Sequence, residues 1–578
     1  MTSPTSISSH HDLVIVGATP AGIAAAIAAA RLGCTVLLLE RSRHIGGLPA
    51  NGLGATDIAT RGLAGGLFRA FTERVLAHYT TTYGAESPQV AACYDGFKFE
   101  PSLAERILGE MLAEHPTITV RVSRQFDALP ERVERSGARI SAIRVTDRDS
   151  GASERCSGVA FIDATYEGDL AAAAGVPFTT RREGADEFHE PAAGRVFMAW
   201  GSHQPAAGST GAGDDALQAY NFRLCLSDRP DNRVAIAKPA TYDRADYASL
   251  IDDLRRDRST GLHTGELEWD GIGKVVNVVW LPNGKTDANN QHLGFVSTDL
   301  PEENWRWPTA DWAWRDRFAQ RLRDYTLGLL WFIQHDPEVP EQIRSNAARF
   351  GLAADEYTDN GHFPRQVYVR EGRRIAGEAT FLAHDALPVA TGQRPPLHPS
   401  AIAASHYQID SHAVRKREPD RVNLDGFIAL PSQPYTIPYG IMVPRTVDNL
   451  WVPVAVSASH LGFGTLRMEP CWMVLGETAG CAAALALRLN VAARAVPVAT
   501  LQREVVRQRG VLIHYRDVPR DHPAYRGLQL LGVRGAIPEW HAQLDALLTA
   551  DEAACWNALA GRDFARAGET RGTALIRL

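Results

Sequence analysis

A turn near the N-terminus has the residue types of a phosphate-binding loop. It reads Gly-Ala-Thr-Pro-Ala-Gly, from Gly17 to Gly22, and lies between an apolar run and an alanine-rich stretch. Gly17 permits the tight turn, Gly22 permits close packing of helix on strand, and free N–H groups at a helix N-terminus can bind a pyrophosphate. Glu40 follows a second apolar run, where a carboxylate can accept hydrogen bonds from an adenosine ribose. Together these residues predict dinucleotide binding.

One position departs from the usual G-x-G-x-x-G pattern. Thr19 stands where the middle glycine belongs, and Ala21 directly precedes the last glycine. A Cβ at Thr19 crowds the phosphate, although its hydroxyl could also donate to it. We include Gly17, Thr19, Ala21 and Gly22 in the predicted cofactor-binding set.

A second glycine-rich segment distinguishes between cofactors. Arg41 precedes the pair Gly46-Gly47, and Gly52 lies a few residues further on. A paired glycine here lets the backbone approach a flavin, which a domain that binds only NAD does not need, so we predict FAD. His44 has two interpretations, a covalent link to the flavin or a histidine packed beside the cofactor loop, and the second is favoured because short motifs mislead.

These residues are positioned by a βαβ unit. Residues 13–17 are apolar and rich in β-branched side chains, which is typical of a strand buried on both faces of a parallel sheet. An alanine-rich helix is predicted to follow this turn and to run to Gly33, which suits a helix C-cap, and residues 35–39 predict the second strand. The turn and Glu40 therefore meet at the carboxyl ends of neighbouring strands.

Longer motifs recur along the chain, from about residue 12 to about residue 490. They are Phe161–Leu170 (FIDATYEGDL), Gln218–Arg223 (QAYNFR), Lys285–Asn290 (KTDANN), Tyr368–Arg374 (YVREGRR) and Ser457–His460 continuing to Arg467–Pro470 (SASH, RMEP). With these motifs the sequence resembles the FAD-dependent oxidoreductases of the glutathione-reductase-like superfamily. Within it, the sequence is similar to a bacterial subgroup whose members often carry the label "xanthan lyase".

The resemblance assigns roles to two later segments. In that superfamily the segment matching residues 159–165 returns the chain to the FAD domain beside the cofactor. The contacts that this implies are Asp163, Ala164 and Thr165. Residues 449–455 predict the last strand of the domain, and a long helix begins near Pro470, a residue suited to a first helical turn. The resemblance places the N-terminus of this helix, with its roughly half positive charge and with Glu469 at its start, under the flavin pyrimidine ring.

The expected fold class is α/β, with a FAD-binding Rossmann-like domain of glutathione-reductase type. We predict that this domain is discontinuous, over residues 1–180 and 365–490, with an inserted α+β substrate domain over residues 181–364. Residues 491–578 predict a C-terminal helical segment, with amphipathic spacing around residues 540–558. Closely spaced tryptophans in the insert are more typical of a core or a lid than of a recognition platform. They are Trp305, Trp307, Trp312 and Trp314.

The catalytic candidates include two histidines, because a group that removes a proton near neutral pH is often histidine. His460 is the leading candidate, in a predicted loop before the long helix; the alternative is a histidine satisfied by backbone groups. His412 is a second acid–base candidate. Arg467 could clamp substrate or a flavin oxygen, or simply pair with Glu469.

The substrate candidates are less specific. Lys285, Asp287 and Asn290 in the insert could contact a hydroxylated substrate. The run that contains Arg370, Arg373 and Arg374 is of the kind that is usually solvated, but the resemblance implies that at least one of these arginines faces cofactor or substrate.

The predicted reaction is hydride transfer from a CH–OH or CH–NH group of a small polar metabolite to FAD. A sugar-like or specialised metabolite follows from the resemblance alone. Oxygen or an external electron acceptor would then reoxidise the flavin, as in an oxidase or a dehydrogenase. A disulfide reductase is excluded because no cysteine lies between Gly46 and Gly54. An FAD-dependent monooxygenase and a non-redox FAD-binding scaffold stay open as alternatives.

Composition narrows the other partners. The 578 residues include 60 basic and 67 acidic ones, a net charge of −7, so nucleic acid and membrane are poor candidate partners. Seven scattered cysteines without a C-x-x-C motif predict neither a disulfide scaffold nor a metal site. The longest apolar stretch, Trp472–Leu489, is interrupted by Glu477 and Arg488, which favours a buried helix over a membrane span. We expect a cytoplasmic protein of several lobes; the oligomeric state is not predicted.

Overall fold

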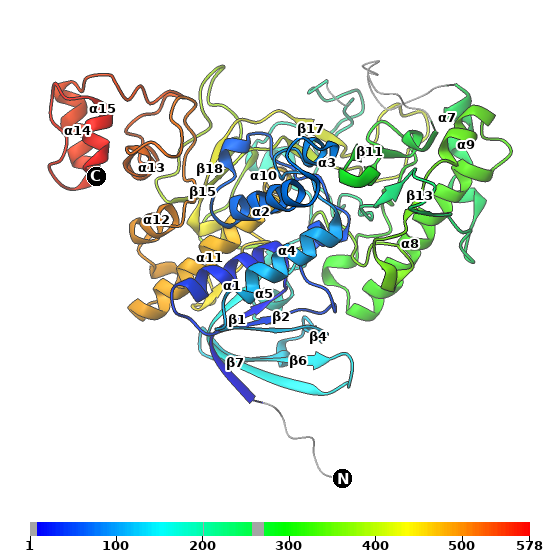
Figure 1. The fold of residues 1–578 in the computed structure, drawn as a ribbon, viewed down its shortest axis with the longest axis horizontal. Coiled ribbons are helices and arrows are strands. Elements are labelled where there is room, and N and C mark those ends of the chain that lie inside the picture. Colours follow the sequence, from blue (N-terminus) through cyan, green and yellow to red (C-terminus); the bar gives the residue numbers. More distant parts are fainter. Residues whose placement is uncertain (1–7, 200–201, 257–270) are drawn as a thin grey trace, which may run out of the picture.

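The apolar run at the N-terminus becomes the central strand of an eight-stranded sheet. The strand β1 (Ser8–Val16) pairs in parallel with β2 (Val36–Leu39) on one side and with β7 (Ser153–Asp163) on the other. The structure, a computed structural model, describes residues 8–199, 202–256 and 271–578. The predicted βαβ unit and its parallel sheet are therefore confirmed (Figure 1).

Alternate residues of β1 enter two different cores. Leu13 and Ile15 pack in the larger cluster, which contains the first helix, whereas Val14 and Val16 pack in a second cluster on the opposite face of the sheet. Successive side chains of a strand point to opposite faces, so an apolar run without polar interruptions must be covered on both sides. The sequence pattern anticipated this burial.

Parallel and antiparallel pairs meet in the same sheet. The strand order is β3-β2-β1-β7-β6-β4, with β19 parallel to β7 and β5 antiparallel to β6. The remaining strands of this sheet are β3 (Ile118–Arg121), β4 (Arg124–Gln125), β5 (Val133–Ser136), β6 (Arg139–Asp147) and β19 (Leu450–Trp451). The parallel strands carry the predicted cofactor turns at their carboxyl ends.

The last strand is shorter than predicted. Of residues 449–455, which the prediction covered, only Leu450 and Trp451 form a strand, β19, and pair with β7. Beyond it, the N–H of Val452 donates to the carbonyl of Met442 at 2.9 Å. The chain leaves the sheet there because its backbone donors turn to a neighbouring segment.

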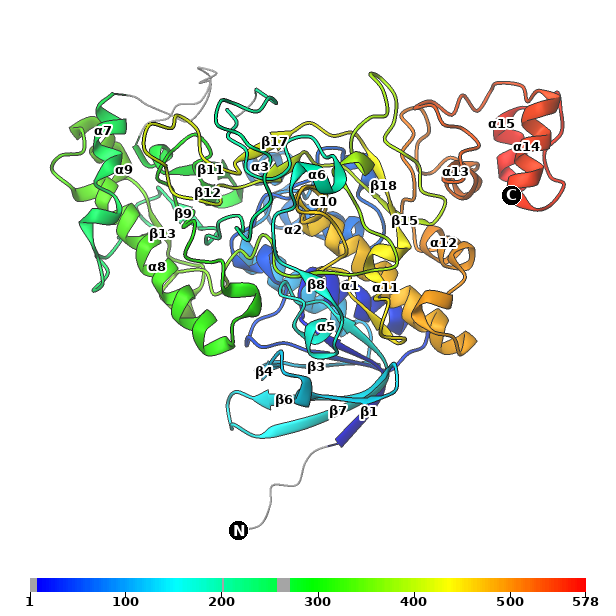
Figure 2. The same cartoon turned by 180° about the vertical axis from the view of Figure 1, so that it is seen from behind.

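Two long helices lie against each other on one face of the sheet (Figures 1 and 2). They are α1 (Pro20–Arg31) and α11 (Glu469–Leu489). Glycines of α11 face the backbone of α1: a Cβ at Gly476 would lie 2.1 Å from the carbonyl oxygen of Ala21, and one at Gly480 would lie 2.2 Å from that of Ala25. The close crossing of these helices therefore depends on the missing side chains.

We expect Gly480→Ala to destabilise the protein. The added methyl group meets rigid backbone, so the helices must separate, at a cost of about 1–3 kcal/mol. Gly109 of the helix α4 (Pro101–Ala113) is a matched control, because a Cβ there meets only the end of the Ile45 side chain at 3.8 Å. Gly109→Ala should raise stability by about 0.5–1 kcal/mol through helix propensity. Urea unfolding of both variants measures this, and equal shifts would contradict the role of the crossing.

The helix α11 is the one helix, among the residues that the structure describes, that is long and apolar enough to cross a membrane. Its apolar window is 94% buried within the protein. It packs against α1 and the sheet, as expected of the core helix that its interrupted sequence predicts.

Further helices and strands of the N-terminal segment surround this core. They are α2 (Gly66–Tyr83), α3 (Pro88–Cys93), α4 (Pro101–Ala113), α5 (Asp169–Ala173) and β8 (Phe178–Thr179). The segment that precedes α11 adds small strand pairs and a short helix. These are β14 (Arg374–Ile375), β15 (Ala401–Ser405), β16 (Ile409–Ser411), β17 (Ile428–Leu430), β18 (Tyr435–Pro438) and α10 (His460–Leu466).

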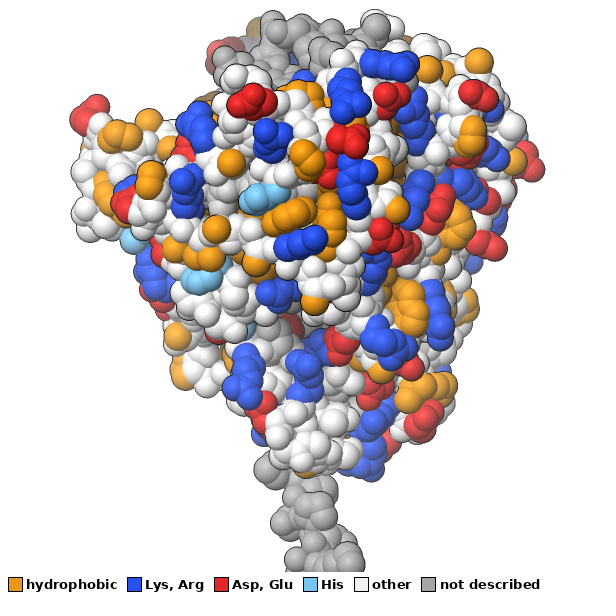
Figure 3. Space-filling model, turned by 90° about the vertical axis from the view of Figure 1, so that its right-hand side faces the viewer, with side chains coloured by type: hydrophobic (Ala, Val, Ile, Leu, Met, Phe, Trp, Pro, Cys, Tyr) orange, Lys and Arg blue, Asp and Glu red, His pale blue; other side chains and the backbone are white. Residues whose placement is uncertain are grey.

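Residues 181–364, the predicted insert, contain short strands and several helices. They are α6 (Ala185–Phe188), β9 (Leu226–Ser227), β10 (Arg233–Val234), α7 (Ser249–Arg255), β11 (Val276–Trp280), β12 (Thr286–Asn290), α8 (Trp312–His335), α9 (Glu341–Ala347) and β13 (Gly351–Ala353). Figure 1 shows α7, α8 and α9 at one side of the sheet. Basic and acidic side chains are mixed across that side in Figure 3, as their near balance in the sequence predicts.

The C-terminal segment is helical and lies at the opposite side of the molecule (Figure 1). Its helices are α12 (Val498–Arg507), α13 (Tyr525–Gly532), α14 (Ala550–Ala560) and α15 (Arg571–Ile576). The amphipathic stretch predicted around residues 540–558 becomes a helix only from Ala550, where Thr549 caps it. The domain boundaries themselves stay predictions.

Candidate cofactor and active site

The turn between β1 and α1 has the close packing that its glycines predict. A Cβ at Gly22 would lie 1.9 Å from the carbonyl oxygen of Gly17, so only glycine fits there. The Thr19 hydroxyl accepts from the N–H of Gly22 at 3.2 Å and donates to the carbonyl of Ala164 at 2.9 Å. This corrects the suggestion that Thr19 donates to a phosphate, because its one hydroxyl hydrogen is already used.

Backbone donors replace that hydroxyl. The N–H groups of Thr19 and Ala21 donate to no acceptor in the part of the chain that the structure describes. They lie at the N-terminus of α1, whose partial positive charge favours an anion. The turn thus keeps the donors that a pyrophosphate needs.

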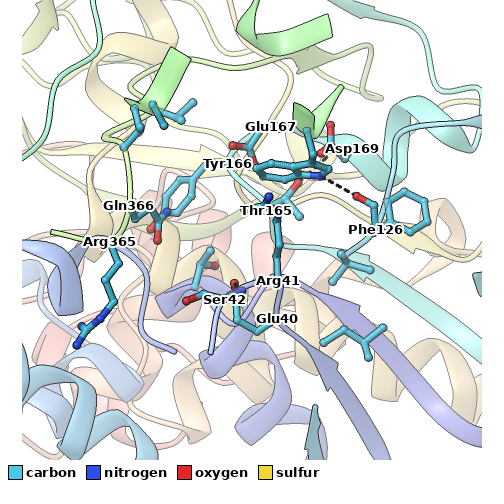
Figure 4. A pocket seen from close by; sticks show the side chains of 18 of the residues that line it. Glu40, Arg41, Ser42, Phe126, Thr165, Tyr166, Glu167, Asp169, Arg365 and Gln366 are labelled. Carbon is cyan, nitrogen blue, oxygen red and sulfur yellow. Dashed lines mark hydrogen bonds between the residues drawn. The ribbon is translucent and has the colours of Figure 1, made fainter. Parts of the chain in front are cut away.

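Glu40 directly follows β2 beside this turn and lines a pocket (Figure 4). Its carboxylate accepts from the N–H of Ala18 and from the N–H of Ser42, both at 2.8 Å. Burial raises the pKa of Glu40, and these two N–H groups act in the opposite direction. Each oxygen keeps a further lone pair, which suits the predicted contact with a ribose.

The insert closes the same pocket from the other side. The Arg41 guanidinium stacks 3.9 Å over the Trp312 ring and pairs with Asp316 at 2.7 Å. The Trp312 indole donates to the carbonyl of Phe126 at 2.9 Å, the bond drawn in Figure 4. Trp307 also lines the pocket. Arg41, a predicted cofactor contact, therefore lines the pocket. Two of the four tryptophans of the insert line it as well.

Asp163 and Thr165 belong to residues 159–165, the third segment predicted to lie beside the cofactor. Asp163 is fully buried and accepts from the Thr165 hydroxyl at 2.7 Å and from the Ala171 N–H at 2.8 Å. Burial raises the pKa of Asp163 to about 6. Thr165 lines the pocket. Asp163 and Ala164 thus shape the turn, and Thr165 faces the ligand space.

The paired glycines pack against a tyrosine that sequence reasoning missed. A Cβ at Gly47 would lie 2.4 Å from the Tyr166 hydroxyl, and Gly46 donates its N–H to the carbonyl of Ala18 at 2.8 Å. Tyr166 donates to Glu469 at the start of α11 and accepts from the N–H of Leu48. The motif that contains Tyr166 was recognised, but nothing in it separated this hydroxyl from its neighbours. Gly52 lies against the carbonyl of Arg223, further along the same loop.

Glu469 is buried, and only one of its two carboxyl oxygens has a hydrogen-bond partner among the described residues. Burial raises the pKa of Glu469 to about 8. A protonated side chain at this place would donate a hydrogen bond, as a carboxylate cannot.

We expect Glu469→Gln to flatten the pH dependence of stability. A carboxyl group whose pKa rises from 4.5 to about 8 on folding binds its proton more tightly in the folded state. The wild-type protein therefore loses stability relative to the variant as the pH rises through that window. Thermal unfolding from pH 5 to pH 9 measures the difference between the two proteins. Parallel curves would show that Glu469 is ionised throughout.

His44 holds two segments together instead of pointing at a cofactor. Its Nδ1 lies 2.9 Å from Glu105, and its Nε2 lies 2.9 Å from Asp359. Both ring nitrogens are engaged, which favours the packed histidine over a covalent link to a flavin.

His460 begins a short helix, and the prediction of a loop there is wrong. Ser459 caps α10 by accepting from the N–H of Gly462 at 2.9 Å. The His460 Nδ1 lies 2.8 Å from Glu371, and its Nε2 lies 3.1 Å from the Ser411 hydroxyl. The ring is buried and its partners are side chains, so the backbone-satisfied alternative does not describe it either.

His412 has a different environment. Its Nδ1 lies 2.7 Å from Asp299, and its Nε2 has Asp410 as its nearest carboxylate, at 3.8 Å. Residues 410 and 412 project from one side of β16 and its continuation, and Ser411 projects from the other. The two histidines therefore contact opposite sides of this segment.

Two arginines, Arg370 and Arg467, lie on the side of β16 and its continuation from which His412 projects. Arg467 contacts the Asp410 carboxylate and the Tyr368 hydroxyl, both at 3.0 Å, and makes no ion pair with Glu469. Burial opposes ionisation of Asp410, but the charges of Arg467 and His412 outweigh it and lower its pKa to about 2. Arg370 pairs with Asp299 at 2.9 Å. The structure thus brings together three predicted residues, His412, Arg370 and Arg467.

The other substrate candidates lie elsewhere. The Lys285 ammonium group is enclosed by carboxylates at 2.7–2.8 Å: Glu100, Asp355 and Glu356. Asn290 is buried at the end of β12. Arg373 and Arg374 are buried as well, and pair with Asp169 and Glu183. The arginine run is therefore an interior feature, and neither Lys285 nor Arg373 joins the group around His412.

Three half-buried side chains complete that group, and sequence reasoning missed all three. Asp57, His292 and Tyr407 are partly exposed. His292 is close enough to His412 and Asp410 to respond to their charges, and Tyr407 lies 3.5 Å from Asp57. Burial lowers the pKa of His292 to about 4. No motif singles these residues out, because they come from three distant segments.

Comparison with known proteins decides the family. Residues 12–505 match the family model described as FAD dependent oxidoreductase. The chain belongs to this family. Its members use FAD, and the pocket beside Glu40 fits the group: it has a glycine cradle without room for a Cβ, free N–H groups at α1 and the Glu40 carboxylate on its wall.

The FAD-dependent oxidoreductase also shows partial likenesses to solved flavoenzymes, while a search of curated proteins gives no match. The flavin-dependent monooxygenase PieE is 17% identical, with a TM-score of 0.22 over 30% of this chain and 33% of that chain. The 3-ketosteroid dehydrogenase of Rhodococcus jostii RHA1 is 16% identical, with a TM-score of 0.19 over 30% and 51%. The glycerol-3-phosphate dehydrogenase of Bacillus halodurans is 10% identical, with a TM-score of 0.21 over 29% and 37%. The chain thus spans about a third of PieE, and nothing about its reaction follows from likenesses of this size.

Proposed function

We propose that this FAD-dependent oxidoreductase oxidises a CH–OH or CH–NH group of a small polar metabolite, with His412 as the base. The observation that carries the proposal is the pairing of His412 Nδ1 with Asp299 at 2.7 Å, while the nearest carboxylate to Nε2 is Asp410 at 3.8 Å, beyond hydrogen-bond distance. When bound, FAD accepts two electrons and a hydrogen from a substrate C–H bond and passes the electrons to oxygen or another acceptor.

The chain's own residues handle the proton. The Asp299 carboxylate accepts the Nδ1 hydrogen, which fixes the tautomer that has a lone pair on Nε2. Nε2 can then take the proton from a substrate O–H or N–H group, and Asp299 stabilises the imidazolium that results. Arg370 holds Asp299 in place from its other oxygen.

His460 is less suited to the same task. Its Nδ1 is held by Glu371, and its Nε2 already lies within hydrogen-bond distance of the Ser411 hydroxyl. A substrate would have to displace that serine in a buried position. We assign His460 a positioning role, in which it fixes the segment that carries His412.

Anaerobic reduction of the bound flavin tests the proposal. Purified holoenzyme is mixed with sugars, alcohols and amines, and loss of the oxidised flavin spectrum is followed. Bleaching by one of these classes supports a dehydrogenase or an oxidase, and peroxide on later exposure to air identifies an oxidase. If flavin is bound but no compound bleaches it, a non-redox scaffold becomes the better description. Oxygen incorporated into the product would indicate a monooxygenase.

A further inference from the structure

The charged groups on the His412 side are almost all paired. Three buried guanidinium groups each have one carboxylate: Arg223 with Asp287 at 2.7 Å, Arg370 with Asp299 at 2.9 Å and Arg467 with Asp410 at 3.0 Å. Each pair is close to neutral. A buried charge without such compensation is costly. The net charge of this region therefore depends on the charged groups that lie outside the three pairs.

Asp57 is the carboxylate that remains. It makes no ion pair within 4.0 Å in the described parts of the chain, and its recorded contact is the Tyr407 hydroxyl at 3.5 Å. Burial raises the pKa of Asp57, and the charges of Arg223 and Arg467 act against that rise. Asp57 is thus close to the paired groups, but it belongs to none of them.

One buried hydrogen-bond acceptor in this region also has no donor within the described part of the chain. The Oδ1 atom of Asp410 is buried and has no hydrogen-bond partner among the described residues, and Asp410 as a whole is 8% exposed. Buried polar atoms normally have partners. A ligand that brings N–H donors and positive charge would satisfy Asp410 and neutralise Asp57 together.

We propose that the substrate is a protonated amine whose ammonium group binds the carboxylates of Asp57 and Asp410 beside His412. An ammonium group supplies three donors and one positive charge, whereas an alcohol supplies one donor and no charge. This inference rests on the proposed function and narrows it from CH–OH or CH–NH groups to CH–NH groups.

The neighbouring histidine gives the amine its reactive form. An ammonium nitrogen has no lone pair, so it must lose a proton before the adjacent carbon can lose hydride. The proton moves from the ammonium nitrogen to His412 Nε2, which leaves a neutral amine and an imidazolium beside Asp299. Asp57 and Asp410 hold the ammonium form for this transfer.

Matched pairs of compounds test the substrate class in the wild-type holoenzyme. Benzylamine and benzyl alcohol, 2-aminobutane and 2-butanol, and glucosamine and glucose are compared by anaerobic flavin bleaching. We expect the amine of a pair to bleach the flavin and its alcohol to react at least about tenfold more slowly, a difference of about 1.4 kcal/mol. Bleaching by alcohols alone overturns the amine inference and leaves the proposed function standing. Bleaching by neither class contradicts the proposed function itself.

Asp57→Asn tests the binding residue, with Asp231→Asn on the surface as the control. The amide keeps the shape of the side chain but removes its charge. We expect kcat/KM for the amine to fall about 30-fold or more, as when one partner of a buried charge pair is lost, with FAD content unchanged. Equal losses for amine and alcohol, or loss of FAD, would overturn the assignment of Asp57.

A second measurement does not depend on any variant. tert-Butylamine has no C–H bond on the carbon next to nitrogen, so it can bind but cannot be oxidised, and tert-butanol is its neutral counterpart. We expect the amine to compete with the bleaching amine and the alcohol not to compete. Competition by both with equal strength would overturn recognition of the charge.

Discussion

His412→Ala should slow flavin reduction by substrate by about 100- to 10,000-fold, the usual contribution of a positioned general base. The reason is the Nε2 atom: Asp299 holds Nδ1 at 2.7 Å, whereas the nearest carboxylate to Nε2 among the described residues, that of Asp410, lies at 3.8 Å and leaves the nitrogen without a hydrogen bond. FAD should stay bound, because the hydrogen-bond and ion-pair partners of His412 among the described residues are Gln218, Asp299, Asp410 and Ser411, none of which belongs to the turn after β1. The measurement is the anaerobic rate of flavin reduction with a compound that bleaches the wild-type protein.

His460→Ala is the matched control, since this ring is also buried and also paired with a carboxylate. Because its Nε2 lies against the Ser411 hydroxyl, its loss should lower stability and shift the rate less than the loss of His412. Urea unfolding measured beside the rate separates the two roles: His460→Ala should lower the unfolding midpoint more than His412→Ala does, and should lower the rate of flavin reduction less. The reverse result would return the catalytic role to His460.

Local sequence patterns were enough to predict the βαβ unit at the N-terminus and the class of cofactor. The uninterrupted apolar run of β1, the glycine at Gly22 and the acid at Glu40 each reflect a constraint that acts within about 30 residues, the length of one βαβ unit. The structure confirms the fold of this unit, since the strand is buried on both faces and Gly22 has no room for a Cβ, and the contact of Glu40 with a ribose stays a prediction. Family membership confirms the cofactor.

The group of side chains around His412 depends on contacts between segments that are far apart in the sequence, so no local pattern predicts it. Asp299 lies 113 positions before His412 in the chain, and the two meet only because the insert folds back against β16. Alternation along β16 places Ser411 and His412 on opposite sides, but sequence spacing does not show that His460 of α10 packs on the Ser411 side. The arginine run after Tyr368 shows the same limit. It has the composition of a solvated face, yet distant carboxylates draw it into the interior.

Asp169→Ala should destabilise the protein by about 3–5 kcal/mol, the cost of leaving a buried charge without its partner. Asp169 is 1% exposed and binds Arg315 of α8 at 2.6 and 2.8 Å and Arg373 at 2.6 Å. It therefore joins the N-terminal segment to the insert and to the segment before α11. Urea unfolding of the holoenzyme measures the effect, with Asp231→Ala as the control, because the Asp231 pair with Arg229 is on the surface and its loss should leave the midpoint unchanged. Equal midpoints for the two variants would mean that the three segments are held together by apolar packing, and that the carboxylate of Asp169 contributes nothing beyond it.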